Sequence, residues 1–222
     1  MVLLTITLKI EEDRVIESPF ILFKHDVSEE EFWSFAHEDL NCELLDGVLV
    51  IHSPANQEHE DIFGYLYILL RQYLEASKEG KVFGSRFVMR LSDKWDPEPD
   101  LLVVKPDRFG SLKEGRLEGP ANMIIEILSE TTREVDLTKK LPRYLESSIE
   151  EVWIIDPKNR AITVHTKDHH TEYTDPKSAQ IITSVVFPGL KLRVQWIWSR
   201  EEYPTIKIIN EIIPSARKKS KN

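Results

Sequence analysis

The chain has 222 residues and a mass of 25.9 kDa, with 41% hydrophobic and 30% charged residues. That composition excludes a disordered chain, because it supplies enough apolar material for a core. The formal net charge is −9, and four basic residues among the last eight leave −13 for the rest of the chain. This balance argues against an extended nucleic-acid surface built on bulk charge, although a compact cationic cleft stays compatible with it.

The chain also lacks the signals of secretion and membrane insertion. A single cysteine, Cys42, excludes an internal disulfide and a cysteine-based metal cluster, and it fits a reducing compartment. The first residues lack the basic leader and long apolar stretch of a signal peptide. No segment approaches the roughly 20 apolar residues of a membrane span. We therefore expect a cytoplasmic protein with no membrane partner.

The first part of the chain predicts a short helix, a hairpin and a long helix. Ser28 followed by Glu31 forms the pattern of a capping box before apolar positions, so a helix should start there. Asp46-Gly47 separates two strand-like runs and is the strongest short hairpin signal. Apolar residues recur at helical spacing over residues 56–77, which indicates a long helix.

The second part of the chain predicts a sheet with a crossover helix. Residues 132–147 indicate this helix, in which Pro142 is a local flaw. The helix connects two apolar runs, so strand, helix and strand form a βαβ unit. Strand-like runs occupy residues 81–90, 100–104, 123–128, 151–155, 161–166 and 180–186.

These elements form one continuous domain. We expect an α/β or α+β fold with a mixed central sheet flanked by helices, to which the first hairpin and helix are N-terminal additions. The domain should span residues 27–200. An N-terminal extension over residues 1–26 precedes it, and a C-terminal extension over residues 201–222 ends in a basic, solvated tail.

Two carboxylates stand where a buried strand would not place them without a reason. Asp100 opens an apolar run directly after Pro99, and Glu126 lies inside the run at residues 123–128. An ionised side chain in a central strand is costly unless it is paired or binds a metal. Three interpretations of Glu126 stay open: an exposed residue on an amphipathic strand, a buried and paired structural residue, or a functional group.

The second helix adds a cation to these carboxylates. Asp136, Lys140 and Tyr144 are spaced four residues apart and share one helix face. The face is either an exposed, salt-bridged surface or a set of groups that points back over the strands. In the second case, Lys140 could stabilise the charge on a phosphate under attack.

Several runs of the chain occur in a specific order and spacing: residues 43–47, Ser53-Pro54, His59 with Ile62, residues 99–104, residues 125–132, Asp136 with Lys140 and Tyr144, residues 151–157 and residues 187–190. Together they resemble the Uma family of restriction-endonuclease-like proteins, within the PD-(D/E)XK nuclease superfamily. The resemblance covers roughly residues 27–197.

The resemblance implies a restriction-endonuclease-like fold in which Asp100 and Glu126 bind Mg²⁺, with Mn²⁺ as a substitute. The superfamily places a lysine two residues after the glutamate, a position that Leu128 occupies here. In the Uma-like arrangement the lysine comes from the following helix. The resemblance therefore implies Lys140 as the catalytic cation, and Lys139 is the alternative.

Glu43 and His59 are further catalytic candidates. Glu43 precedes the hairpin turn and either supplies a third carboxylate or is a solvated strand residue. His59, near the start of the long helix, either contacts a phosphate or transfers a proton, or it is a structural residue.

The leading hypothesis is a Mg²⁺-dependent DNA endonuclease that hydrolyses phosphodiester bonds. Asp100 and Glu126 would hold the metal, and Lys140 would stabilise the developing charge. The rival hypothesis is a catalytically silent protein of the same fold that binds a protein or a nucleic acid. We also expect a homodimer, in which Trp196 and Trp198 would cover an apolar interface.

Overall fold

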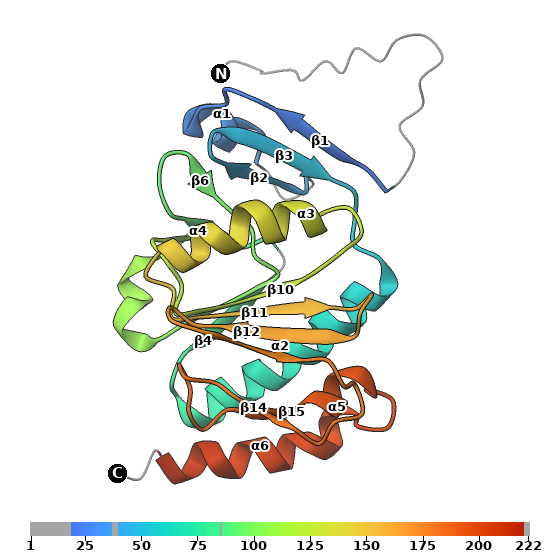
Figure 1. Ribbon diagram of the computed structural model, residues 1–222. Helices are drawn as coiled ribbons and strands as arrows, with labels where there is room; N and C mark the ends of the chain where they lie inside the picture. The colour runs from blue at the N-terminus through green and yellow to red at the C-terminus, as the bar shows by residue number, and fades with distance from the viewer. Residues whose placement is uncertain (1–18, 37–39, 85, 220–222) are drawn as a thin grey trace.

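The computed structural model describes residues 19–36, 40–84 and 86–219 (Figure 1). Most of the expected N-terminal extension, residues 1–18, lies outside the described residues, and so do the side chains of the basic tail. Within the described ranges, no helix combines the length and the apolar character that crossing a membrane requires.

A six-stranded sheet forms the centre of the molecule, with the strand order β13-β12-β11-β10-β7-β4. β10 and β11 run parallel and the other neighbours run antiparallel, so the sheet is mixed. The strands are β4 (Lys81–Gly84), β7 (Leu101–Val104), β10 (Met123–Ile127), β11 (Glu151–Asp156), β12 (Ala161–His165) and β13 (His170–Tyr173). The four strands expected between residues 100 and 166 are confirmed. β13 was not predicted, because this edge strand is largely exposed and carries no apolar pattern.

Helices cover both faces of this sheet (Figure 1). α2 (Gln57–Ser77) packs on one face, and α6 (Thr205–Lys219) packs against α2. α3 (Arg133–Val135) and α4 (Leu141–Glu146) cover the other face and are joined by a π-helical turn (Asp136–Lys140). The path from β10 through these helices to the parallel strand β11 is the expected βαβ unit.

The alternation of side chains along β10 determines the direction of the Glu126 carboxylate. Side chains alternate along a strand, so Ile125 and Ile127 enter the core on the α2 side, and Ile124 and Leu128 enter the core on the α4 side. Helices on both faces require apolar residues on both, which explains the continuous apolar runs in the sequence. Glu126 lies on the α4 face and therefore points toward the second helix.

The second helix differs from the single helix expected over residues 132–147. Its π turn, Asp136–Lys140, closes with the N–H of Leu141 donating to the carbonyl of Asp136, five residues earlier. Pro142 lies in the first turn of α4, where its missing N–H removes few hydrogen bonds. Both end residues of the turn are buried. The wider turn thus places two side chains under the helix.

A four-stranded antiparallel sheet with the order β1-β3-β2-β6 lies beyond α3 and α4 (Figure 1). The predicted capping box is present, because the Ser28 side chain accepts from the N–H of Glu31 and the Glu31 side chain accepts in return. Asp46 and Gly47 have φ values of 54° and 75°, as a two-residue type I′ hairpin turn requires. The elements of this region are β1 (Ile21–Lys24), α1 (Glu29–Phe35), β2 (Cys42–Leu45), β3 (Val48–His52) and β6 (Trp95–Asp96).

The single strand expected over residues 81–90 is wrong, because the segment forms two strands in two different sheets. β4 ends at Gly84, and β5 pairs with β9 in a small three-stranded sheet. Arg86, between the two strands, has a φ of 70°, a left-handed conformation that interrupts an extended chain. The strands of the small sheet are β5 (Val88–Arg90), β8 (Leu112–Lys113) and β9 (Arg116–Glu118). A 3₁₀ helix (Pro106–Ser111) directly precedes β8.

The C-terminal part of the chain packs under α2. It contains β14 (Ile181–Thr183), β15 (Lys191–Arg193) and α5 (Val194–Trp198), followed by α6. Trp196 and Trp198 are only 4% and 7% exposed and lie in the core that includes residues of α2 and α6. The expected apolar interface at these two residues is therefore wrong, because their own chain covers them.

Candidate active site

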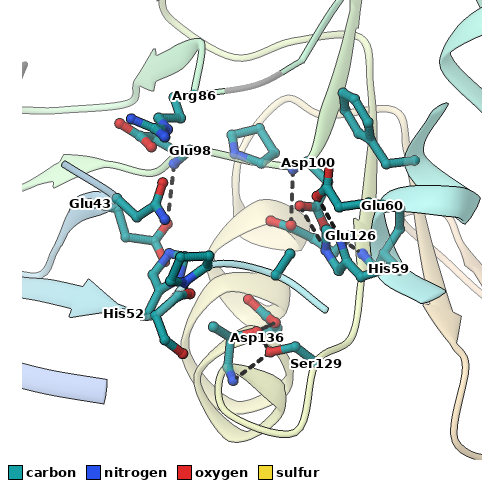
Figure 2. Close-up of a pocket in the computed structure, with 18 of the residues that line it drawn as sticks. Glu43, His52, His59, Glu60, Arg86, Glu98, Asp100, Glu126, Ser129 and Asp136 are labelled. Carbon is teal, nitrogen blue, oxygen red and sulfur yellow. Dashed lines mark hydrogen bonds and ion pairs between the residues drawn. The ribbon is translucent and has the colours of Figure 1, made fainter. Parts of the chain in front are cut away.

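A cavity of about 380 Å³ is lined by residues of the six-stranded sheet, the second helix and the N-terminal sheet (Figure 2). Figure 2 shows Glu43 on one side of the cavity and Asp100 with His59 on the other. All the candidate residues of the sequence analysis line this cavity: Asp100, Glu126, Lys140, Glu43 and His59. The structure thus brings together groups that are separated by up to 97 residues along the chain.

Asp100 and Glu126 are joined by the hydrogen bonds of neighbouring strands. Asp100 precedes β7, and its Oδ2 accepts a hydrogen bond from the N–H of Ile127 in β10 at 2.7 Å. The N–H of Asp100 donates in turn to Oε2 of Glu126 at 3.3 Å. Glu126 is only 2% exposed. The interpretation of Glu126 as an exposed residue on an amphipathic strand is therefore wrong.

Lys140 is enclosed by carboxylates. Its Nζ lies 2.8 Å from Oε1 of Glu126, and Oδ1 of Asp136 and Oε2 of Glu43 follow at 3.2 and 3.3 Å. The helix face is therefore not an exposed, salt-bridged surface. Burial by itself lowers the pKa of a lysine, but the surrounding carboxylates, Glu126 above all, outweigh it and hold the pKa of Lys140 well above its ordinary value. Lys140 is thus a fixed cation in the cavity.

The carboxylates around Lys140 outnumber it. Burial raises the pKa of Glu126 to about 8, because the ammonium offsets only part of the cost of removing a carboxylate from water. Burial also raises the pKa of Asp136, which shares the same cation. The cluster therefore carries more potential negative charge than one lysine can neutralise, and a further cation would stabilise it.

Leu128, two residues after Glu126, does not line the cavity. Leu128 is 5% exposed and packs in the apolar core on the α4 side. The ammonium of Lys140 reaches Glu126 from the helix instead. Lys139, the alternative, is exposed to solvent and does not line the cavity.

Two residues of the same helix face contact the cluster, although the sequence analysis gave them no role of their own. The hydroxyl of Tyr144 donates to Oε1 of Glu126 at 2.7 Å, and Tyr144 is fully buried. Asp136 accepts a hydrogen bond from the Thr132 hydroxyl at 2.7 Å. The four-residue spacing with Lys140 is the signal that finds both residues once Lys140 is placed beside Glu126.

Glu43 links the N-terminal sheet to the cluster. It lies in β2 and is 2% exposed, so it is not a solvated strand residue. Besides contacting Lys140, its Oε2 accepts a hydrogen bond from the N–H of Glu98 at 3.1 Å. The Glu98 side chain also lines the cavity, near Arg86 (Figure 2), and burial raises its pKa to about 8. Glu98 was not predicted from the sequence, because the prolines on either side of it indicate only a turn.

His59 contacts Asp100 from the first turn of α2. The side chain of Asn56 caps this helix by accepting from the N–H of His59 at 2.9 Å. Nε2 of His59 lies 3.1 Å from Oδ1 of Asp100. Burial disfavours the charged imidazole, but the contacts with Asp100 and Glu60 outweigh it and raise the pKa of His59 above its ordinary value. His59 is therefore a partner of Asp100 rather than an isolated residue at a helix end.

Asp100 and Glu126 are the residues of the cavity that could hold a divalent metal ion. Within the described part of the chain, no three His, Cys, Asp or Glu side chains form a group that could hold a metal ion by themselves. Mg²⁺ is usually held by one or two carboxylates and keeps several waters, whereas Zn²⁺ takes three or four protein ligands. Asp100, just before β7, and Glu126, in the neighbouring strand β10, are two carboxylates of the kind that hold Mg²⁺.

A protein family and a solved structure are similar to this chain. The family model Uma2, described as "Putative restriction endonuclease", matches residues 29–195. A crystal structure of "a putative nuclease belonging to DUF820" from Anabaena variabilis is similar with a TM-score of 0.67 and 18% sequence identity, over 78% of this chain and 98% of that chain. No curated protein matches the chain. The fold is restriction-endonuclease-like, as expected, and family and fold together indicate a nuclease.

Proposed function

This chain belongs to the Uma2 family, and from that premise we propose that it is a Mg²⁺-dependent endonuclease that hydrolyses phosphodiester bonds in DNA. The observation that carries the proposal is the convergence of Asp100, Glu126 and Lys140 in one cavity, with the lysine Nζ 2.8 Å from Glu126. Two neighbouring strands and the helix between two parallel strands supply these groups.

Asp100 and Glu126 are the residues that would hold Mg²⁺. When bound, the ion supplies Lewis-acid polarisation of a phosphate oxygen and makes a water more acidic. The N–H of Ile127 and the imidazole of His59 orient Asp100 from two sides. The hydroxyl of Tyr144 orients Glu126. Such supporting contacts keep the carboxylate oxygens in the direction that a metal requires.

Lys140 supplies a fixed positive charge. A phosphodiester under attack gains negative charge on its oxygens, so a positioned ammonium lowers the barrier. Glu43 and Asp136 hold the ammonium from two sides, and its burial strengthens its field relative to a lysine in water. The charge is therefore in place before the substrate arrives.

A second function, a catalytically silent protein that binds a partner, has one observation in its favour. Three carboxylates already surround Lys140, so its charge is balanced without a phosphate. Hydrolysis requires a phosphate to compete with one of these carboxylates for the ammonium. A cleavage assay separates the two functions.

The assay offers supercoiled, linear and single-stranded DNA with Mg²⁺ or Mn²⁺, and EDTA serves as the blank. We expect the wild type to cut and Glu126→Gln to lose about 10²–10³-fold or more in rate, because glutamine keeps the size of the side chain but not its charge. Glu146→Gln, at a carboxylate on α4 that is 71% exposed, is the matched control and should cut like the wild type. Failure of the wild type to cut any substrate with either metal would favour the binding protein.

Metal binding has a readout that does not depend on cleavage. Calorimetric titration with Mn²⁺ should detect a site in the wild type and in Glu146→Gln. The signal should disappear in Glu126→Gln and in Asp100→Asn, because each variant loses one charged ligand. Equal binding by all four proteins would remove these two carboxylates from the metal site.

The homodimer stays a prediction, but Trp196 and Trp198 cannot form its interface because they are buried within their own chain. An enzyme that cuts both strands of a duplex gains from two active sites related by a two-fold axis. Light scattering at micromolar concentration tests it, and a species of 25.9 kDa would contradict it.

A further inference from the structure

A second cavity, of about 520 Å³, lies where α2 passes the edge strand β4. Figure 1 shows α2 running below the central sheet, of which β4 is an edge strand, and the two elements are in contact. The mechanism proposed above uses none of its residues. We call it the α2–β4 groove and define it by six of the residues that line it: Tyr67, Arg71, Lys78, Lys81, Phe83 and Phe109.

The α2–β4 groove and the candidate active site meet at a pair of stacked rings. Phe63 lines the first cavity, and its ring stacks on the ring of Tyr67 with centroids 5.9 Å apart and an interplanar angle of 18°. A β-carbon at Gly84 would lie 2.7 Å from the Phe63 ring, so glycine is what lets the end of β4 approach this stack. From Phe63 to Lys78, α2 and its cap rise by about 22 Å at 1.5 Å per residue. That length matches roughly six stacked nucleotides at 3.4 Å each.

The charge of the groove is opposite to that of the first cavity. Arg71, Lys78 and Lys81 line it with a single carboxylate, Glu75, which pairs with Arg71. The first cavity is lined by six carboxylates, one arginine and one lysine. The whole chain has a net charge of −9, so the positive charge of this groove is opposite in sign to that of the chain as a whole. It is instead a place where a phosphate backbone finds a complementary charge.

Aromatic rings accompany these cations. Tyr67, Phe83 and Phe109 line the groove from three different elements. The Lys81 Nζ lies 4.8 Å from the centre of the Phe109 ring, and Phe83 stacks on Phe87 at 4.5 Å. Rings on which bases stack, combined with a cationic groove, are the features that bind single-stranded nucleic acid without sequence preference.

We propose that the α2–β4 groove binds a single-stranded segment of nucleic acid and guides it to the candidate active site. Bases stack on Tyr67 and Phe109, and the phosphates contact Lys78 and Lys81. This inference rests on the proposed function, because the groove matters for cleavage only if the first cavity hydrolyses a phosphodiester. It names the substrate class as a chain with unpaired nucleotides.

The other occupant that an edge strand invites is a second polypeptide strand, which would extend the sheet at β4. Two features of β4 oppose it. The strand is only four residues long, and Lys81 on it is exposed. Short edge strands that carry lysine are the usual protection against strand addition. The structure therefore favours nucleic acid, and strand addition is an outcome that the test detects.

The test measures fluorescence anisotropy of a labelled oligothymidine and of a duplex of the same length, in EDTA so that no cleavage occurs. We expect the single strand to bind more tightly than the duplex. Lys78→Ala/Lys81→Ala should weaken binding and lower the slope of log K against log salt by about 1.4, since each lost phosphate contact on a single strand contributes about 0.7. Tyr67→Leu should weaken binding at least about fivefold and leave that slope unchanged.

The matched control is Lys177→Ala/Lys191→Ala, which removes the same charge from two exposed lysines outside the groove. It should bind like the wild type. Circular dichroism confirms the fold of each variant, and Phe109→Leu replaces Tyr67→Leu if the latter unfolds. A variant that only disturbed the fold would not produce this pattern, in which the lysine variant lowers both the affinity and the salt slope and Tyr67→Leu lowers the affinity alone.

Four outcomes would overturn the inference: preference for the duplex, equal weakening by the control pair, no weakening by the groove variants, or a dimer by light scattering that the groove variants abolish. The last of these would mean that a second copy occupies the edge. Because the assay runs in EDTA, it is independent of catalysis. Binding in the groove without cleavage in Mg²⁺ contradicts the proposed nuclease alone, whereas cleavage that the groove variants do not affect contradicts the groove alone.

Discussion

Two buried glutamates on neighbouring strands have opposite surroundings. Glu126 lies near the carboxyl end of β10, and Glu151 opens β11 at the other end of the sheet. Glu126 contacts an ammonium and a tyrosine hydroxyl on the wall of a cavity. Glu151 accepts hydrogen bonds from four neutral donors, which are Trp153 Nε1 at 2.6 Å, Ser184 Oγ at 2.7 Å, and the N–H groups of Val185 and Val186 at 2.9 and 3.0 Å.

The difference shows that burial alone does not identify a functional carboxylate. The two residues are 2% and 0% exposed. Four neutral donors fill the acceptor capacity of Glu151, so it anchors residues 184–186 to β11 and has nothing left for a ligand. Oε2 of Glu126 has only a long contact of 3.3 Å with a backbone N–H. The partners of Oε1 are the ionisable side chains of Lys140 and Tyr144. Ionisable partners and an open cavity are what distinguish the candidate catalytic residue.

The largest expected effect concerns the cation beside Glu126. Lys140→Ala should lower the cleavage rate by about 10²–10³-fold, because it removes the ammonium that we propose stabilises the developing charge. Lys139→Ala, at the exposed neighbour, is the control and should change little. Single-turnover cleavage of DNA, on protein whose fold is checked by circular dichroism, measures both. Unchanged cleavage by Lys140→Ala would break the comparison, since the ionisable partner would then be dispensable.

Substitution of Glu151, at the opposite end of the sheet, should change the stability of the protein and not its cleavage activity. Glu151→Gln should lower the free energy of unfolding by about 2–4 kcal/mol, because a charged acceptor of four hydrogen bonds becomes a neutral one with a single oxygen. Urea unfolding measures this change, and the fraction that is folded should still cut DNA. A variant that keeps its stability but loses cleavage would reverse the roles given to the two glutamates.

A third buried carboxylate, Asp96 in β6, differs from both glutamates. Among the described residues, neither of its oxygens has a hydrogen-bond partner, and burial raises its pKa to about 7. Between about pH 4 and pH 7, the Asp96 carboxyl keeps its proton in the folded protein and releases it in the unfolded chain. The free energy of unfolding should therefore fall as pH rises, by up to about 1.4 kcal/mol per unit from this group. Above pH 7 its contribution is constant.

Asp96→Asn tests this sign, because asparagine cannot titrate. The unfolding free energy of the variant, minus that of the wild type, should increase from pH 4 to pH 7 and then level off. Urea unfolding at each pH measures the difference, which cancels the groups that both proteins share. A difference that stays constant over this range would show that Asp96 ionises normally.

The smallest expected effect concerns the hydroxyl that orients Glu126. Tyr144→Phe removes one hydrogen bond of 2.7 Å and keeps the ring in the core. A typical hydrogen bond contributes about 0.5–1.5 kcal/mol, so cleavage should slow by roughly twofold to tenfold. Tyr173→Phe, on β13, is the control and should cut like the wild type. A loss as large as that of Lys140→Ala would mean that Tyr144 does more than orient a neighbour.

The parts of the fold that follow local rules could be predicted from the sequence. The capping box at Ser28, the Asp46-Gly47 turn and the long helix all depend on residues close in the chain, and the structure contains them. The strand on either side of the crossover helix was also predicted, because β10 and β11 are covered on both faces and therefore apolar throughout.

Features that depend on distant contacts could not be predicted. The chain breaks after Gly84, where Arg86 adopts a left-handed conformation that arginine does not signal in a sequence. Trp196 and Trp198 lie in α5, whose contacts include the distant helix α2, so their burial depends on residues far away in the sequence. Polar edge strands such as β13 have no periodic signal at all.

The candidate site shows the same division. The convergence of Asp100, Glu126 and Lys140 was expected from the order of the motifs, and the structure brings them together. Glu98 could not be found, because its contact is with Glu43, a residue distant in the sequence. The catalytic roles of all these residues stay predictions until cleavage is measured.

The π turn between α3 and α4 determines which mutations the crossover tolerates. A π turn contains one residue more than the helical turn it replaces, so deleting one residue from Asp136–Lys140 would leave an ordinary helix. Because the wider turn absorbs its extra residue, the flanking helices would keep their phase, but Asp136 and Lys140 would stand three residues apart instead of four, which changes the contact between them. Substitutions at the exposed position Lys139 leave this register intact. The length of the crossover is therefore under stronger constraint than its composition.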